Sequence, residues 1–160
     1  MVDAADGISG GNLALKGLGY FQGKVHILPI SVYYEDTDLS GMVYHANYLR
    51  YMERGRTEFF RLAGISRARL DDEEPTAWTI RRIAVEYLRP ARLDDKIAVH
   101  SLLTEVSGVR LKALQRIRYG ESLLAEGRIE ACMTTLTGKP RRMPRKVHDT
   151  LAPFVTTEDT

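Results

Sequence analysis

Two carboxylates and one imidazole stand close together between residues 32 and 61. Asp36 and Asp38 precede a Gly-containing break, and His45 follows it near the start of the longest helix that the sequence predicts. The residues before the break alternate as a strand does. A strand end, a turn and a helix N-terminus therefore bring an acid, an imidazole and free backbone N–H groups close together. That arrangement suits an attack on an acyl carbonyl.

Asp38 is our main candidate for the reacting group. A carboxylate can attack an acyl carbonyl directly, or it can activate a water molecule as a general base. The structural alternative is a turn aspartate whose oxygens accept local backbone N–H groups. We assign Asp36 to that structural role, in which it shapes the turn.

His45 is the candidate for assisting proton transfer. The positive end of the helix dipole disfavours the imidazolium form, so the neutral ring can accept or relay a proton near pH 7. The alternative is a packed or capping histidine. The unpaired backbone N–H groups of Tyr44, His45 and Ala46 are candidates for binding an oxyanion. We expect Asp38 and these amides to converge on one small, ligand-accessible cavity.

Composition narrows the class of protein. The 160 residues predict one domain, and 44% hydrophobic with 28% charged residues is typical of a globular protein. A net charge of +2 is too small to indicate nucleic-acid binding. The single cysteine, Cys132, excludes an intramolecular disulfide and fits a reducing compartment. With no apolar run long enough for a membrane span and no secretory signal pattern, we expect a cytoplasmic protein.

The order of elements predicts an α+β domain. Residues 1–23 are rich in Gly and Ala and lack a sustained period, which predicts a loosely ordered arm. A strand follows over 24–34, with a bulge or an edge position at Pro29. The helix is predicted over about 44–64, with Gly64 suited to its C-cap and Gly55 allowing another backbone to approach closely. Its apolar or small stripe comprises Tyr48, Tyr51, Met52, Gly55, Phe59, Leu62 and Ala63.

Four further strands are predicted after residue 77, in hairpin-like succession. A bulge is expected around Arg81 and Arg82, and Gly120 marks a hairpin turn. We take 24–148 as the single domain and 149–160 as a polar tail. One sheet packed on one helix leaves sheet edges uncovered, so dimerisation by edge pairing is expected.

Two stretches carry a resemblance to a known family. The segment YYEDTDLSGMVYHANYLRYMERGRTEFF, residues 33–60, resembles the signature of hotdog-fold acyl-CoA thioesterases. It is most similar to the Tol-Pal-associated branch of the 4-hydroxybenzoyl-CoA thioesterase family. The segment VEYLRPARLDDKIAV, residues 85–99, also resembles that branch. Together the likeness spans about residues 24–148.

The resemblance implies a hotdog fold, in which a five-stranded antiparallel sheet wraps around one long central helix. It implies homodimers, often homotetramers, and hydrolysis of acyl-CoA thioesters without a metal or organic cofactor. Asp38 and His45 match the family's catalytic acid and histidine. Tyr34 matches a tyrosine that helps to orient substrate or water, although the alternation also places Tyr34 on the inner strand face, where packing alone would explain it.

The resemblance also places CoA-binding cations at the start of the strand that begins near residue 110. Arg110 is therefore the first candidate for binding the CoA phosphates, and Lys112, Arg141 and Arg142 are the others. Solvated charge on an outer strand face is the structural alternative. This strand lacks the interleaved aromatic residues that nucleic-acid stacking would need. Leu39 and Ser40 occupy positions where the family commonly has smaller residues, which leaves the acyl preference open.

Two other functions fit the same residues. The first is a non-catalytic adaptor that binds acyl carrier protein or envelope-lipid enzymes through the basic face formed by Arg110, Lys112, Arg116 and Arg118. The second is an acyl-CoA hydratase, because a fold alone does not fix the reaction type.

Overall fold

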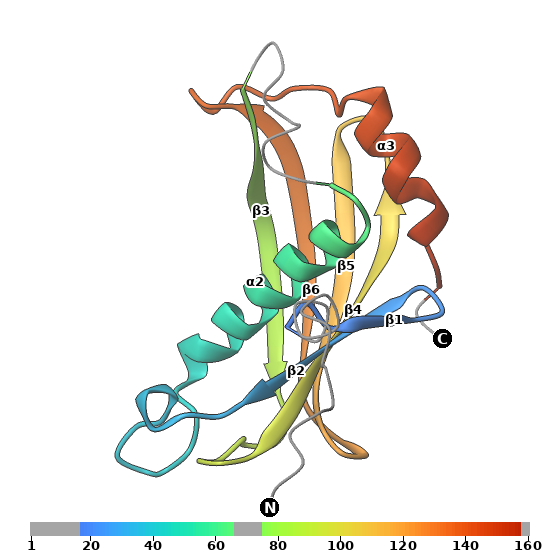
Figure 1. Ribbon diagram of the computed structural model, residues 1–160. Helices are drawn as coiled ribbons and strands as arrows, with labels where there is room; N and C mark the ends of the chain where they lie inside the picture. Colours follow the sequence, from blue (N-terminus) through green and yellow to red (C-terminus); the bar gives the residue numbers. More distant parts are fainter. Residues whose placement is uncertain (1–16, 66–74, 158–160) are drawn as a thin grey trace, which may run out of the picture.

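A computed structural model describes residues 17–65 and 75–157 of the chain. The long helix α2 (His45–Leu62) lies across one face of a six-stranded antiparallel sheet that curves around it (Figure 1). The strands are β1 (Tyr20–Gln22), β2 (Val25–Ser31), β3 (Thr76–Tyr87), β4 (Lys96–Val106), β5 (Arg110–Tyr119) and β6 (Ser122–Thr135). The described residues also form three short helices, η1 (Tyr34–Asp36), α3 (Arg145–Leu151) and η3 (Ala152–Phe154). The predicted α+β class and wrapped helix are confirmed.

The strand neighbours differ from the predicted hairpin succession. The spatial order is β1-β2-β4-β5-β6-β3, so β3 lies at one edge and pairs with β6. Of the four strands from β3 onward, only β4, β5 and β6 follow one another as hairpins, and Gly120 with φ +55° forms the predicted β5–β6 turn. Alternation in the sequence identifies a strand, but it does not identify that strand's neighbours.

Local irregularities follow the sequence closely. The β3–β6 register shifts between Ile80 and Arg82, which confirms the predicted bulge. Pro29 keeps a continuous register against β4 and lies beyond the reach of β1, so it occupies an edge position without a bulge. Gly64, with φ +93°, follows the end of α2, as the predicted C-cap requires.

Both ends of the described chain are more structured than expected. Residues 20–22, placed in the predicted arm, form β1 and make the sheet six-stranded rather than five-stranded. Phe21 packs edge-on against Phe59 of α2, with ring centroids 5.1 Å apart. Residues 149–154, expected to begin a polar tail, form the end of α3 and η3, where Leu151 is fully buried. Residues 1–16 of the arm lie outside the described residues, and so do residues 66–74, for which the charged composition of 66–75 predicts a solvated loop.

The core between α2 and the sheet forms two clusters. One surrounds Tyr48, Tyr51 and Met52 of α2, and the other surrounds Phe59 together with Leu151 of α3. The predicted helix stripe is confirmed at the five buried positions Tyr48, Tyr51, Met52, Gly55 and Phe59. Among the described residues, no helix combines the length and apolarity needed to cross a bilayer.

A buried polar network fixes α2 against the sheet. The Gln115 side chain donates to the Met52 carbonyl and to Ser101 Oγ, each at 2.8 Å, and accepts from Arg56 Nη1 at 2.8 Å. Gly55 lies against the same network. A Cβ at Gly55 would approach Val99 Cγ1 to 2.8 Å and Gln115 Nε2 to 3.0 Å. The groups that approach Gly55 closely are side chains of the sheet, not the second backbone that was predicted.

The Gly55→Ala variant should have a lower free energy of unfolding than wild type. Overpacking a core costs about 1 to 3 kcal/mol, which exceeds the gain of at most about 1 kcal/mol in helix propensity. The urea denaturation midpoint measures the change. Thr57→Ala, at an exposed position of the same helix, should leave the midpoint unchanged or raise it. Equal midpoints for the two variants would contradict the close contact at Gly55.

Candidate active site at the start of the central helix

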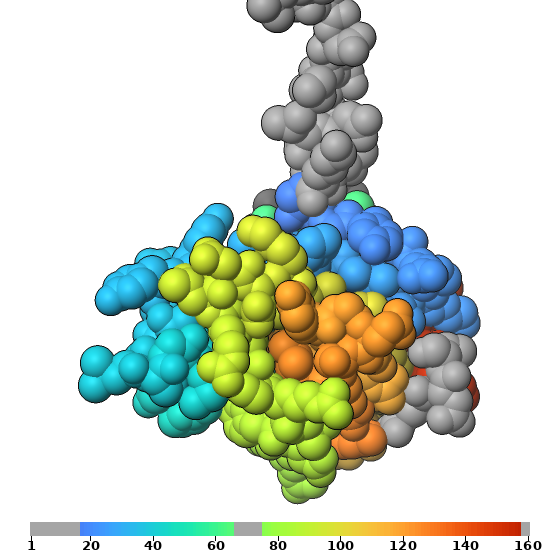
Figure 2. All heavy atoms as spheres, turned by 90° about the horizontal axis from the view of Figure 1, so that it is seen from below, coloured from blue at the N-terminus to red at the C-terminus, as the bar shows by residue number. Residues whose placement is uncertain are grey.

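A small hairpin delivers Asp38 to the start of α2. Thr37 and Val43 form an isolated antiparallel bridge, and the Asp38 N–H donates to the Met42 carbonyl at 3.0 Å. Gly41 closes the turn with φ +75° and donates its N–H to the Asp38 carbonyl at 3.0 Å. This segment, in blue to cyan, lies at one edge of the molecule beside the green and yellow of β3 and the following turn (Figure 2).

The Asp38 carboxylate is held in its ionised form by Ser40. Asp38 Oδ1 accepts the Ser40 N–H at 2.8 Å and also accepts a short hydrogen bond from the Ser40 hydroxyl. These bonds, with a smaller contribution from the charge of His45, lower the pKa of Asp38. The side chain is fully exposed in the single chain. It is therefore a solvent-accessible, ionised carboxylate, which is the form that a nucleophile or a general base requires.

Asp36 joins the hairpin to the helix. Its buried carboxylate accepts the Tyr33 N–H at 2.8 Å, and its backbone carbonyl accepts the Tyr44 N–H at 2.9 Å and Asn47 Nδ2 at 2.8 Å. Burial and the nearby Asp36 carboxylate raise the pKa of Tyr51. The turn-shaping geometry assigned to Asp36 is present. Asn47 was missed by the sequence analysis, although a buried amide within an aromatic helix face is an unusual residue choice that could have drawn attention to it.

The first turn of α2 offers two backbone donors rather than three. The Tyr44 N–H donates to the Asp36 carbonyl, so Tyr44 is withdrawn from the predicted oxyanion donors. The N–H groups of His45 and Ala46 open an 18-residue helix and have no hydrogen-bond acceptor within the described part of the chain. Their dipoles add, and they favour negative charge at this end of the helix.

His45 is held by aromatic neighbours. Its ring lies 4.5 Å from the Tyr44 ring and 6.3 Å from the Tyr87 ring, measured between centroids. The Tyr87 hydroxyl donates to the His45 carbonyl at 3.1 Å. Tyr87, at the end of β3, is a further site residue, after Asn47, that the sequence did not predict. It lies 42 positions after His45 in the chain, so no local pattern links the two residues.

Tyr34 does not lie on an inner strand face. It belongs to η1 and is 82% exposed, so the predicted packing position is wrong. The cause is the early end of β2 at Ser31. The chain leaves the sheet after Val32, whose N–H donates to the Asp95 carbonyl at 3.0 Å. Tyr34 therefore stands on the surface of the same segment as Asp38.

The predicted enclosed cavity around Asp38 is also absent from the described single chain. Asp38 and His45 are exposed, and so are Tyr33, Leu39 and Tyr44 beside them. The acid and the helix start share one open surface rather than a pocket. Large apolar side chains gathered on an open surface are typical of a face that another molecule covers.

The four candidates for binding the CoA phosphates lie far from Asp38 in the single chain. Arg110 pairs with Glu130 at 3.1 Å, and Lys112 pairs with Glu105 at 2.8 Å. Across the sheet, Arg110 of β5 pairs with Cys132 of β6, and Cys132 pairs with Thr79 of β3. His45 instead contacts Tyr87, at the C-terminal end of β3. Eight residues of strand separate these two levels by about 26 Å.

Arg141 and Arg142 follow β6, at the same end of the molecule as Arg110. The Arg141 N–H donates to the Met133 carbonyl at 2.9 Å, and Arg142 lies beside Gly108 at the β4–β5 turn. The four predicted CoA ligands therefore gather at one end of the sheet, but one chain does not bring them to Asp38. The described residues contain no cluster of three or more His, Cys, Asp or Glu side chains suited to a metal ion.

Comparisons with known proteins agree with this architecture. Residues 32–151 match the model of the thioesterase-like superfamily. The chain is 41% identical over 121 residues to the acyl-CoA thioester hydrolase YbgC of Escherichia coli O6:H1, covering 74% of this chain and 90% of that protein. It is 36% identical over 120 residues to the acyl-CoA thioesterase YbgC of Haemophilus influenzae, covering 74% and 88%.

A solved structure extends the likeness to three dimensions. The crystal structure of a probable thioesterase from Bartonella henselae superimposes with a TM-score of 0.72 at 36% identity, covering 75% of this chain and 99% of that one. The residues that match the family model, 32–151, include the hairpin, the central helix and all the strands from β3 onward. The chain therefore belongs to the thioesterase-like superfamily and has its hotdog fold.

Proposed function

We propose that this protein hydrolyses acyl-CoA thioesters to a free acid and CoA, with Asp38 as the nucleophile or general base and His45 assisting. The observation that carries the proposal is the exposed, ionised Asp38 carboxylate, held by Ser40 beside the first turn of α2. The names of the two relatives, an acyl-CoA thioester hydrolase and an acyl-CoA thioesterase, supply the substrate class.

Both chemical routes use the same groups. In one, Asp38 attacks the thioester carbon, the C–S bond breaks, and water then hydrolyses the resulting mixed anhydride. In the other, Asp38 takes a proton from water while the water oxygen attacks the carbon. In each route the developing oxyanion needs donors, which we assign to the His45 and Ala46 amides, and the CoA thiolate leaves and takes up a proton.

A second copy of the chain completes the site in this proposal. The edge strand β3 exposes Ile80 and Ile83, and the hairpin face exposes Tyr33, Leu39 and Tyr44. A long apolar sheet edge favours pairing with another strand. A homodimer formed through β3 would cover this face, exclude water from Asp38 and allow the partner's basic end to approach the substrate. We retain a homodimer or homotetramer as the proposed assembly.

The adaptor alternative has weaker support than hydrolysis. It requires the basic face of β5 to be available to an acidic partner such as acyl carrier protein. Arg110, Lys112 and Arg116 each form an ion pair with a glutamate. Such pairs reduce the charge that a partner would meet. Release of free thiol, rather than hydration of an enoyl group, separates hydrolysis from the hydratase alternative.

Replacing Asp38 with asparagine should lower kcat for CoA release by about 100-fold or more, because the amide can neither attack nor take a proton. Release of CoA from a panel of acyl-CoAs, followed with a thiol reagent, measures the change. Glu35→Gln removes an exposed carboxylate from the neighbouring turn and should keep wild-type turnover. Normal turnover by a folded Asp38→Asn protein would refute the assignment.

Removing the Ser40 hydroxyl should move the acid limb of the pH–rate profile to higher pH. Ser40 lowers the pKa of Asp38 by bonding to the ionised form, so Ser40→Ala lets that pKa rise and protonates Asp38 at a higher pH. The dependence of kcat/KM on pH measures the shift. Thr37→Ala loses a hydroxyl that donates to the Tyr34 carbonyl in the same segment, and its acid limb should stay in place. Coincident limbs for Ser40→Ala and wild type would contradict an ionised Asp38 in catalysis.

The Arg110→Gln variant should raise KM for acyl-CoA by about 10-fold, the loss expected for one charge-assisted contact to phosphate. The same acyl group on N-acetylcysteamine lacks the CoA phosphates, so its turnover should be unchanged. Arg61→Gln, which removes a charge from an exposed position on α2, serves as the control. Equal losses with both thioesters would show that Arg110 acts on the fold rather than on CoA.

A further inference from the structure

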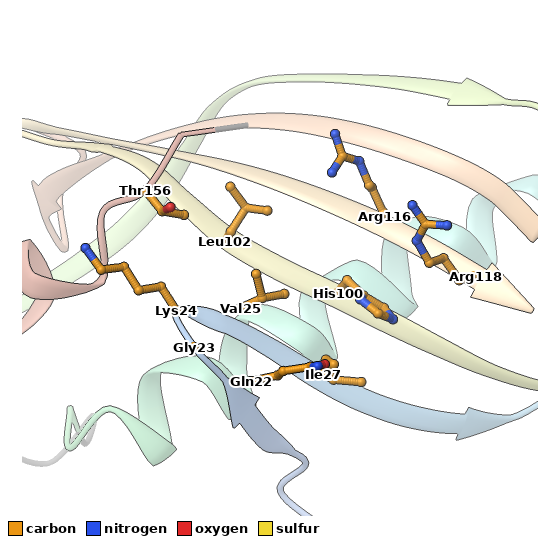
Figure 3. Close-up of a pocket in the computed structure, with 10 residues that line it drawn as sticks. All are labelled: Gln22, Gly23, Lys24, Val25, Ile27, His100, Leu102, Arg116, Arg118 and Thr156. Atoms are coloured by element: carbon orange, nitrogen blue, oxygen red, sulfur yellow. The ribbon is translucent and has the colours of Figure 1, made fainter. Parts of the chain in front are cut away.

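A cavity of about 570 Å³ lies on the face of the sheet that points away from α2. Its lining residues on β2, β4 and β5 alternate with residues of the core, such as Leu28, Val99 and Ile117, so they point to the opposite side. The lining includes Lys24, Ile27, His100, Leu102, Arg116 and Arg118 (Figure 3). None of these residues belongs to the proposed active site.

Cations stand at both ends of this cavity. Figure 3 shows Arg116 and Arg118 together with His100 at one end and Lys24 beside Thr156 at the other. Lys24 Nζ donates to the Val155 carbonyl at 2.9 Å, and Arg118 Nη1 donates to the Glu121 carbonyl at 3.4 Å. Both acceptors are neutral carbonyls, and neither Lys24 nor Arg118 forms an ion pair within residues 17–65 and 75–157.

The arginine end of the cavity carries two guanidinium groups. Arg116 Nε pairs with Glu126 Oε2 at 2.9 Å, and Arg128 contacts the same glutamate at 3.4 Å, whereas Arg118 donates to a backbone carbonyl. His100 is half-buried next to both arginines of the cavity. Burial, then Arg118 and Arg116, lower the pKa of His100. The two arginines add to the effect of burial, and an anion bound beside His100 would be stabilised by the same two charges.

The middle of the cavity is apolar. Leu102, 1% exposed, and Ile27, 6% exposed, form its floor, and Val25 lies between the charged ends. A concave site of this volume with an apolar floor and a few convergent polar groups has the character of a small-molecule site. Guanidinium groups match the planar, bidentate geometry of carboxylate and phosphate oxygens.

We propose that this cavity binds a small amphipathic oxyanion, with its carboxylate or phosphate head on Arg116, Arg118 and His100 and its aliphatic part along Ile27 and Leu102. The site is separate from Asp38. The cavity lies on the outer face of the sheet, whereas Asp38 lies near the start of α2, which packs on the opposite face. Its existence does not depend on the proposed hydrolysis. A released fatty acid and a phosphate-bearing amphiphile share the required chemistry.

Isothermal titration calorimetry with three six-carbon probes tests the proposal on the full chain. Hexanoate carries the carboxylate, hexyl phosphate carries the phosphate, and hexanol carries the same tail without charge. At least one anion should bind wild type measurably, and hexanol should not. The tighter of the two anions identifies the head group. Failure of both anions to bind at millimolar concentration, or equal binding of hexanol, would overturn the proposal.

The Arg118→Gln variant locates the binding. It should weaken the anion about 10-fold, the effect of one charge-assisted hydrogen bond, while Arg118→Lys keeps the charge and loses less. Arg61→Gln removes the same charge from an exposed position on α2, outside the cavity, and should bind as wild type does. Equal weakening by Arg118→Gln and Arg61→Gln would place the effect in overall charge and refute the site. All three variants should retain CoA release, so loss of anion binding and failure of hydrolysis are distinguishable.

Discussion

The buried carbonyl and carboxylate of Asp36 are the constraint on which the candidate active site depends. They bind Tyr33, Tyr44 and Asn47, and they fix the acidic hairpin to the first turn of α2. Asp38 is thereby set beside the helix start while its own carboxylate stays exposed. The two aspartates therefore differ in environment. Asp36 is buried and its carboxylate accepts a backbone N–H, whereas Asp38 is exposed and accessible to a substrate.

The rest of the fold serves to hold that helix start in place. Gly55 allows α2 to approach the sheet closely, and Gln115 bonds to the Met52 carbonyl from β5. Tyr87 reaches the His45 carbonyl from the end of β3. The opposite face of the sheet is therefore released from packing on the helix, and it carries the basic cavity with its apolar floor. In our proposals, one side of the sheet holds the helix that opens the active site and the other side binds the anion.

Local patterns in the sequence predicted the parts of the fold that are themselves local. The helix stripe around Tyr48 to Phe59, the Gly64 cap and the bulge before Arg82 all follow from periodicity and residue type. Long-range features escaped prediction. The pairing of β3 with β6 and the reach of Tyr87 to His45 depend on which strands become neighbours. Strand β1 escaped because its flanking glycines are equally typical of a loose arm.

The site residues divide in the same way. Asp38 and His45 were predicted because a turn and a helix start are neighbours in sequence, whereas Tyr34 was misplaced because β2 ends early. A crystal structure with a non-hydrolysable acyl-CoA analogue tests the central claim most directly. We predict the carbonyl oxygen within hydrogen-bond distance of the His45 and Ala46 amides and the carbonyl carbon beside the Asp38 carboxylate. An analogue whose carbonyl lies away from both Asp38 and the helix start would contradict this account.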